Sequence, residues 1–165
     1  MAYDIGYTQT DQLGQMQGWL SLWDLPDSST ASRMDWMGGT AADHGMVMGS
    51  TAASSAAPSA TGGTSAAAGT GAAADTPLMP GMATDAEIAK LKGLTGTESD
   101  IYFLQLMIRH HQGGAGMMQY AAQHAALPVV RNFADKMLQA QTAEISVMTQ
   151  MLAEHGAEPL PAPAG

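Results

Sequence analysis

The chain of 165 residues contains no cysteine, which excludes a disulfide framework, a thiolate metal site and a cysteine nucleophile. Charged residues are also scarce, at 13% of the chain where about 25% is typical of globular proteins. Only 6 residues are lysine or arginine, and the formal net charge is −9. This acidity argues against binding to nucleic acid or to an anionic membrane surface, because both need a basic face on the protein.

Long apolar runs are missing as well. No run reaches the roughly 18 residues that a transmembrane helix needs, so we expect no membrane insertion. The segment Met1–Tyr7 has neither the basic start nor the apolar stretch of a signal peptide. No serine lies in the Gly-x-Ser-x-Gly pattern of hydrolase nucleophiles, and nucleophilic catalysis is therefore not supported.

Methionine, in contrast, is abundant, with 14 residues in the chain. Most of them are explained as flexible fillers of an apolar core. The thioether sulfur is also a soft ligand that selects Cu(I). Unlike a thiolate, it is not lost to disulfide formation in an oxidising compartment.

The N-terminal part is predicted to form one helix, followed by a long region without a core-forming pattern. Apolar residues at steps of three and four predict a helix over residues 8–24, which ends at Pro26. Residues 26–49 are irregular and rich in methionine. Residues 50–76 are almost entirely Ala, Ser, Thr, Gly and Pro. Burial of such residues cannot offset the entropy of ordering them, so we predict a flexible linker.

The C-terminal part is predicted to form three closely spaced helices. A short helix at about 84–93 begins with the capping box Thr84-Asp85-Ala86-Glu87. Long helices follow at about 97–126 and 128–155, and their short connection makes them antiparallel neighbours. Gly156 is expected to supply the C-cap of the last helix.

The chain is therefore divided into four segments. We predict residues 1–25 as the last helix of a truncated first repeat, 26–78 as a Met/His-containing loop and low-complexity linker, 79–156 as a double-histidine helical domain, and 157–165 as a disordered tail.

The truncated repeat is inferred from an internal similarity between the first and the last helix. At one constant spacing, Gln9-Thr10, Met16 and Leu20 recur as Gln141-Thr142, Met148 and Leu152. The first helix thus matches the last helix of an earlier copy of the C-terminal unit, whose front helix is missing. Three helices leave apolar faces exposed. Either the true start of the chain lies upstream, together with the export signal, or the bundle is completed by self-association as a homodimer.

Imidazole and thioether groups share one stripe of the helix at 97–126. Spacings of three and four place Met107, the pair His110/His111 and Met117 on that stripe. Three glycines lie in the same helix, and each costs about 1 kcal/mol relative to alanine. These residues, Gly113, Gly114 and Gly116, indicate either close helix–helix contact or room for an ion or a second backbone.

The final helix faces this stripe with two polar residues. Gln141 and Glu144 interrupt an apolar stripe that includes Met148, and buried polar groups are costly unless they are paired. The antiparallel arrangement predicts that the His110/His111 turn lies near them. Two interpretations remain open. Glu144 can simply hydrogen-bond a core histidine, or the adjacent histidines, flanked by methionine, can be metal ligands.

The methionines outside the helices are less well explained by packing. Met34, Met37, Met46 and Met48 surround His44 in a segment with little core-forming pattern. Met79-Pro80-Gly81-Met82 places two sulfurs around a turn. These residues either bind soft metal ions in a flexible segment or are sacrificial sites of methionine oxidation.

A long motif in the C-terminal part resembles a known family. The sequence Asp100-x-x-Phe-Leu-x-x-Met-Ile-x-His-His-Gln-Gly is followed by Pro128-x-Val-Arg and Gln141-x-x-Glu-Ile-x-x-Met. This pattern resembles the ferritin-like "domain of unknown function" family marked by a double-histidine motif, which includes periplasmic copper-binding proteins. The segments Asp43-His44-Gly45 and Met79–Met82 resemble that family too, whereas Gly114 departs from its usual alanine.

The resemblance implies an all-α fold: a ferritin-like antiparallel helical bundle, here with an incomplete first repeat and a long flexible linker. It implies a metal site for copper, with silver as a surrogate for Cu(I). The candidate metal residues are Asp100, Met107, His110, His111, Met117, Glu144 and Met148, with His44, Met79 and Met82 from the loops.

We therefore expect a metal-binding protein rather than an enzyme, one that sequesters Cu(I)/Cu(II) or confers copper resistance in the periplasm or as a secreted protein. One alternative is a structural or oligomerising helical module without metal. A diiron-type oxidase is less favoured, because that chemistry uses Glu-x-x-His motifs and the chain has none.

Overall fold

The computed structural model describes residues 1–28, 35–37 and 79–163. Within these residues the chain forms four α-helices and one 3-10 helix, Asp35–Met37, and no strand. The predicted all-α class is thereby confirmed. The linker and the loop residues His44, Met34, Met46 and Met48 lie outside the described residues. The chain divides into two units, residues 1–38 and 39–165, which are described separately.

The first unit is built on α1, Ala2–Leu22, which starts earlier than the predicted residue 8. The terminal ammonium of Met1 pairs with Asp4 at 2.7 Å, and an acid in the first turn also complements the helix dipole. At the other end Asp24 adopts a positive φ of 53°. The Leu25 amide then reaches the Leu20 carbonyl at 2.9 Å, which closes the helix before the proline that follows.

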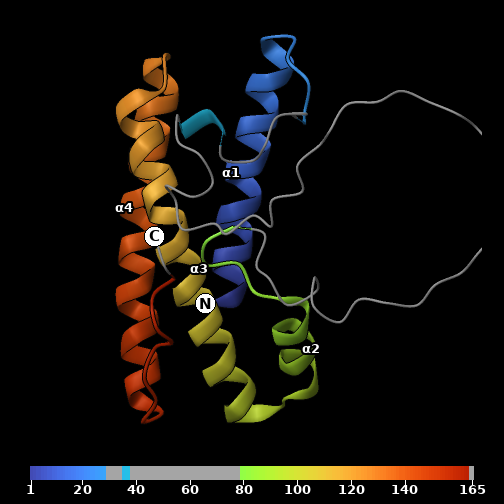
Figure 1. The fold of residues 1–165 in the computed structure, drawn as a ribbon, viewed down its shortest axis with the longest axis vertical. Helices are drawn as coiled ribbons and strands as arrows, with labels where there is room; N and C mark the ends of the chain where they lie inside the picture. Colours follow the sequence, from blue (N-terminus) through green and yellow to red (C-terminus); the bar gives the residue numbers. More distant parts are fainter. Residues whose placement is uncertain (29–34, 38–78, 164–165) are drawn as a thin grey trace, which may run out of the picture. The chain divides into compact units, whose positions relative to one another are not determined.

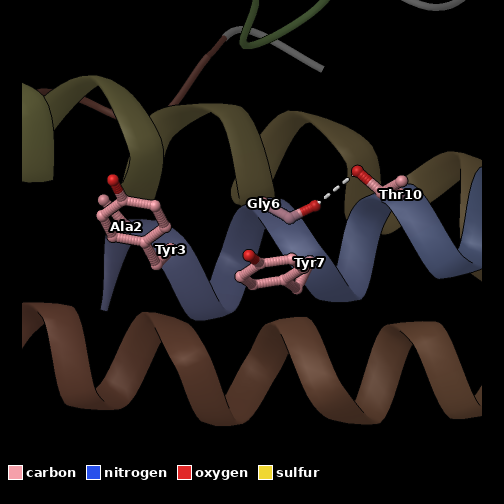
Figure 2. A pocket seen from close by; sticks show the side chains of 5 residues that line it. All are labelled: Ala2, Tyr3, Gly6, Tyr7 and Thr10. Atoms are coloured by element: carbon pink, nitrogen blue, oxygen red, sulfur yellow. Dashed lines mark hydrogen bonds between the residues drawn. The ribbon is translucent and has the colours of Figure 1, made fainter.

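One surface of α1 carries a shallow hollow lined by Ala2, Tyr3, Gly6, Tyr7 and Thr10 (Figure 2). The two tyrosine rings stack with centroids 6.4 Å apart, and both residues are largely exposed. The Thr10 hydroxyl donates back to the Gly6 carbonyl at 2.8 Å. The lining contains no titratable group other than the two phenols.

The second unit contains α2, Asp85–Gly93, α3, Gly96–His124, and α4, Pro128–Glu154. The predicted capping box starts α2: the Glu87 amide donates to Thr84 Oγ1 at 3.2 Å, and the Thr84 amide donates to Glu87 Oε2 at 2.9 Å. The helices α3 and α4 lie side by side and run antiparallel, with α2 beside α3 (Figure 1).

The α3–α4 connection is fixed by Arg131, whose guanidinium donates to the carbonyls of Ala125 and Ala126 at 2.7 and 3.0 Å. The far end of α4 closes as predicted at Gly156, which has a φ of 65°. The Ala157 amide donates to the Leu152 carbonyl at 3.0 Å there. The short loop and the capped helix ends together determine how α3 and α4 align along their lengths.

The buried side chains of this unit come from α3 and α4. They are Tyr102, Leu104, Leu106, Ile108, His111, Met118, Ala134, Met148 and Leu152, and among them only His111 is strongly polar. The tail was expected to be disordered. Residues 157–163 form neither helix nor strand, and Gln105 Nε2 of α3 donates to the Glu158 carbonyl at 2.7 Å.

Candidate functional site

The centre of the candidate site is a buried pair between α3 and α4. His111 is 0% exposed, and its Nε2 lies 2.7 Å from Glu144 Oε2. The Glu144 side chain keeps 25% exposure, so one edge of the pair reaches solvent. The predicted approach of the histidine turn to Glu144 is confirmed by this bond.

The second ring nitrogen of His111 has no hydrogen-bond partner in the described part of the chain. A carboxylate can only accept, so Nε2 carries the proton in this bond and donates it. A neutral ring then presents a lone pair at Nδ1, and this buried atom has no hydrogen-bond partner among the described residues. Leaving a buried polar atom unpaired costs about 1–3 kcal/mol. A metal-bound histidine has the same arrangement, since its other nitrogen typically donates to a carboxylate.

His110 differs from its neighbour. It is only partly buried, and this burial is the main reason why its pKa lies below the usual 6.5. The ring is therefore neutral at physiological pH and retains a lone pair for a ligand. The two imidazoles meet edge to face, with centroids 6.1 Å apart and planes at 75°.

The predicted helical methionines lie on the two helices that carry the pair. Met148 is 0% exposed and lies one helical turn after Glu144 on α4. Met107 lies one turn before His111 and Met117 lies two turns after His110, both half-buried on α3. The fold thus places thioethers on the same helices and close in register to the imidazoles.

One predicted residue, Asp100, is not brought to the histidines. Asp100 is exposed near the start of α3, ten residues before His110. That separation corresponds to about 15 Å along the helix axis. His44 lies outside the described residues. Gln141, which the sequence also singled out, lies where expected, since a Cβ built on Gly114 would be 3.5 Å from its Oε1.

The Met79–Met82 turn docks directly on the histidine segment of α3. The Met82 amide closes the turn on the Met79 carbonyl at 3.1 Å, and Gly81 has a φ of 80°. A Cβ on Gly81 would lie 2.5 Å from the Arg109 carbonyl oxygen. A Cβ on Gly113 would lie 2.2 Å from the Pro80 carbonyl oxygen. Of the two interpretations of the glycines, Gly113 therefore makes room for a second backbone.

Sequence reasoning missed the ion pair that attaches α2 to α3. Glu87 accepts from both terminal nitrogens of Arg109, with the Nη1–Oε1 distance at 2.8 Å. The Arg109 hydrogen bonds are the main reason why the pKa of Glu87 lies below its usual 4.5. The available signal was Arg109 itself, a cation inside the otherwise uncharged segment 101–112.

A second missed residue is Gln112, which follows the histidine pair. Its Oε1 is buried without a hydrogen-bond partner among the described residues. Arg109 Nε is also buried without a hydrogen-bond partner among these residues. Together with His111 Nδ1, three such polar atoms lie within one turn of α3. Within the described part of the chain, no three His, Asp or Glu side chains converge as a metal cluster. The candidate site therefore relies on methionine sulfur beside the histidines.

Among the residues that the structure describes, none of the helices combines the length and apolar character needed to span a bilayer.

Comparisons with known proteins identify one family. The sequence profile described as "Domain of unknown function (DUF305)" matches residues 1–152. No curated protein matches. A crystal structure of a DUF305 protein from Streptomyces coelicolor, provisionally described as secreted, is similar with a TM-score of 0.71. It shares 35% sequence identity, and the match covers 97% of this chain and 75% of that one.

Proposed function

The chain belongs to the DUF305 family, and from this premise we propose that it binds copper as Cu(I) through the seam between α3 and α4. The observation that carries the proposal is the fully buried Nδ1 of His111, for which no residue that the structure describes supplies a hydrogen bond. Imidazole and thioether are ligands that suit Cu(I). His111 would anchor the ion, with sulfur from Met107 and Met148 as the nearest candidates in register.

Glu144 has a positioning role in this proposal. By accepting the Nε2 proton it fixes the ring orientation and tautomer, and it raises the basicity of Nδ1. The carboxylate was predicted as a ligand from sequence. Because the carboxylate accepts a hydrogen bond from Nε2, we propose that it orients His111 and does not contact the ion itself.

The bound ion would be stored rather than turned over. We propose sequestration or copper resistance outside the cytoplasm, in the periplasm or as a secreted protein. Two features support that location: the description of the Streptomyces coelicolor relative as secreted, and a ligand set without cysteine. The ferritin-like arrangement and the homodimer stay predictions that belong to the same proposal.

The test is titration of metal-free protein with Cu(I) against a chromophoric competing chelator. The decisive variant is His111→Gln, because the glutamine Nε2 can still donate to Glu144 while the Nδ1 lone pair is removed. We expect wild-type protein to withdraw Cu(I) from the chelator, and the variant to lose that ability for one equivalent. Equal binding by both proteins would refute the proposal. Ag(I) should behave like Cu(I) in the same assay.

A purely structural role is the second candidate, and the His111–Glu144 bond also favours it, since it pairs two polar groups in a core. The two candidates differ in metal-linked stability. A ligand that binds only the folded state at 100 times its Kd adds about 2.7 kcal/mol to the free energy of unfolding. A structural module predicts melting curves that Cu(I) and Ag(I) leave unchanged.

A further inference from the structure

The two adjacent histidines of α3 serve different sides of the helix. Consecutive residues project about 100° apart on an α-helix, so neighbours in sequence do not face the same element. His111 is enclosed and bonded to Glu144 of α4. His110 keeps partial exposure, and no described carboxylate pairs with it. An ion held by His111 in the α3–α4 seam therefore does not account for His110.

The side of α3 next to His110 is covered by the Met79–Met82 turn. Gly81 packs on the Arg109 carbonyl and on the backbone of Gly113, the residues on either side of His110 in the same helical turn. The contact is backbone against backbone. The Glu87–Arg109 pair secures the segment immediately after the turn to the same stretch of α3.

We propose that His110 and the methionines of the Met79–Met82 turn form a second site for a soft monovalent cation, separate from the His111 site. This inference rests on the proposed function, because it assumes that the chain binds Cu(I). One imidazole and two thioethers, without a carboxylate, select Cu(I) or Ag(I) over harder ions. His110, Met79 and Met82 are all partly exposed, so an ion reaches this site without the helices separating.

The experiment counts Cu(I) equivalents bound by the full chain in the presence of a chromophoric chelator. We expect His110→Asn to lose one equivalent relative to wild type. The double variant Met79→Leu/Met82→Leu should lose the same equivalent, so adding His110→Asn to it removes no more. The half-buried Met151 of α4 provides the matched control, and Met151→Leu should retain every equivalent.

Separation of the two sites is tested by combining the histidine variants. His110→Asn and His111→Gln should each remove one equivalent, and together they should remove two. If both single variants remove the same equivalent, the histidines share one site, and the second site is refuted while the proposed function stands. If His110→Asn or the methionine pair loses nothing, the second site is also refuted. If His111→Gln is the one variant that loses no equivalent, the result contradicts the His111 site and not the second site.

A further variant keeps every proposed ligand and only moves the turn. In Gly113→Ala the new Cβ would meet Pro80 backbone at 2.2 Å, so the turn must leave its place on α3. We expect the affinity of the His110 equivalent to fall at least tenfold, with the His111 equivalent unchanged. Circular dichroism confirms that the helices persist. Unchanged affinity at both sites would mean that the turn contributes no ligand.

Discussion

Replacing Gly113 and Gly116 by alanine, one at a time, gives the sharpest test of the docked turn. Both glycines lie inside α3, so both substitutions gain the same helix propensity of about 1 kcal/mol. Their surroundings differ. A Cβ on Gly116 meets nothing within 4 Å, whereas a Cβ on Gly113 would lie 2.2 Å from the Pro80 carbonyl oxygen and 2.7 Å from Gly81 Cα. These obstructions are backbone atoms, which cannot rotate away as a side chain does.

The difference between the two variants isolates the cost of the clash. Overpacking of this kind costs about 1–3 kcal/mol, so Gly113→Ala should be less stable than Gly116→Ala by about that amount. Gly116→Ala should itself be more stable than wild type. Urea denaturation of the metal-free protein, followed by far-ultraviolet circular dichroism, measures both. Equal stability of the two variants would refute the contact between the turn and α3.

Four further outcomes follow from the ion pairs and the histidines. Glu144→Gln should weaken Cu(I) binding about 10–100-fold, because it removes the carboxylate that orients His111; unchanged affinity in the chelator assay would contradict that role. Glu87→Ala should cost about 1.5–3 kcal/mol, because the charged hydrogen bonds to Arg109 and one half of the capping box are lost; urea denaturation against the exposed control Glu154→Ala measures this. Since the pKa of Glu87 is lowered, its contribution is present above pH 4.5 and is lost as the pH falls through the lowered value, so the gap between wild type and Glu87→Ala should close in acid. The lowered pKa of His110 predicts that apo stability declines as the pH falls below 6.5, where the unfolded chain takes up the proton more readily; His110→Asn should flatten that slope, and parallel slopes would refute the assignment.

The helices could be predicted largely because their ends have local signals. The Thr84 capping box and the glycine after α4 both act within a few residues of chain, and the structure has both. The start of α1 was missed because the helix has no side-chain cap at its N-terminal end. A pattern of apolar residues does not mark such a start.

The candidate site was predictable only where helix periodicity and a short loop bring residues together. His111 and Glu144 meet because α3 and α4 are antiparallel neighbours of matched register. The contact between Gly81 and Gly113 joins two backbone segments that are distant in sequence. Because glycine has no side chain, its residue type gives no indication of what it contacts. The Glu87–Arg109 pair also joins residues that are distant in sequence. The place of Glu87 in the capping box therefore did not predict its ion pair with Arg109.

The Glu87 side chain takes part both in the capping of α2 and in its attachment to α3. The same carboxylate accepts the amide hydrogen bond that starts the helix and the guanidinium bonds that attach it to α3. A helix of 9 residues is too short to persist alone in water. Its amides should therefore exchange with solvent deuterium as one cooperative group, at the rate at which the carboxylate releases Arg109, rather than fraying from the ends one hydrogen at a time.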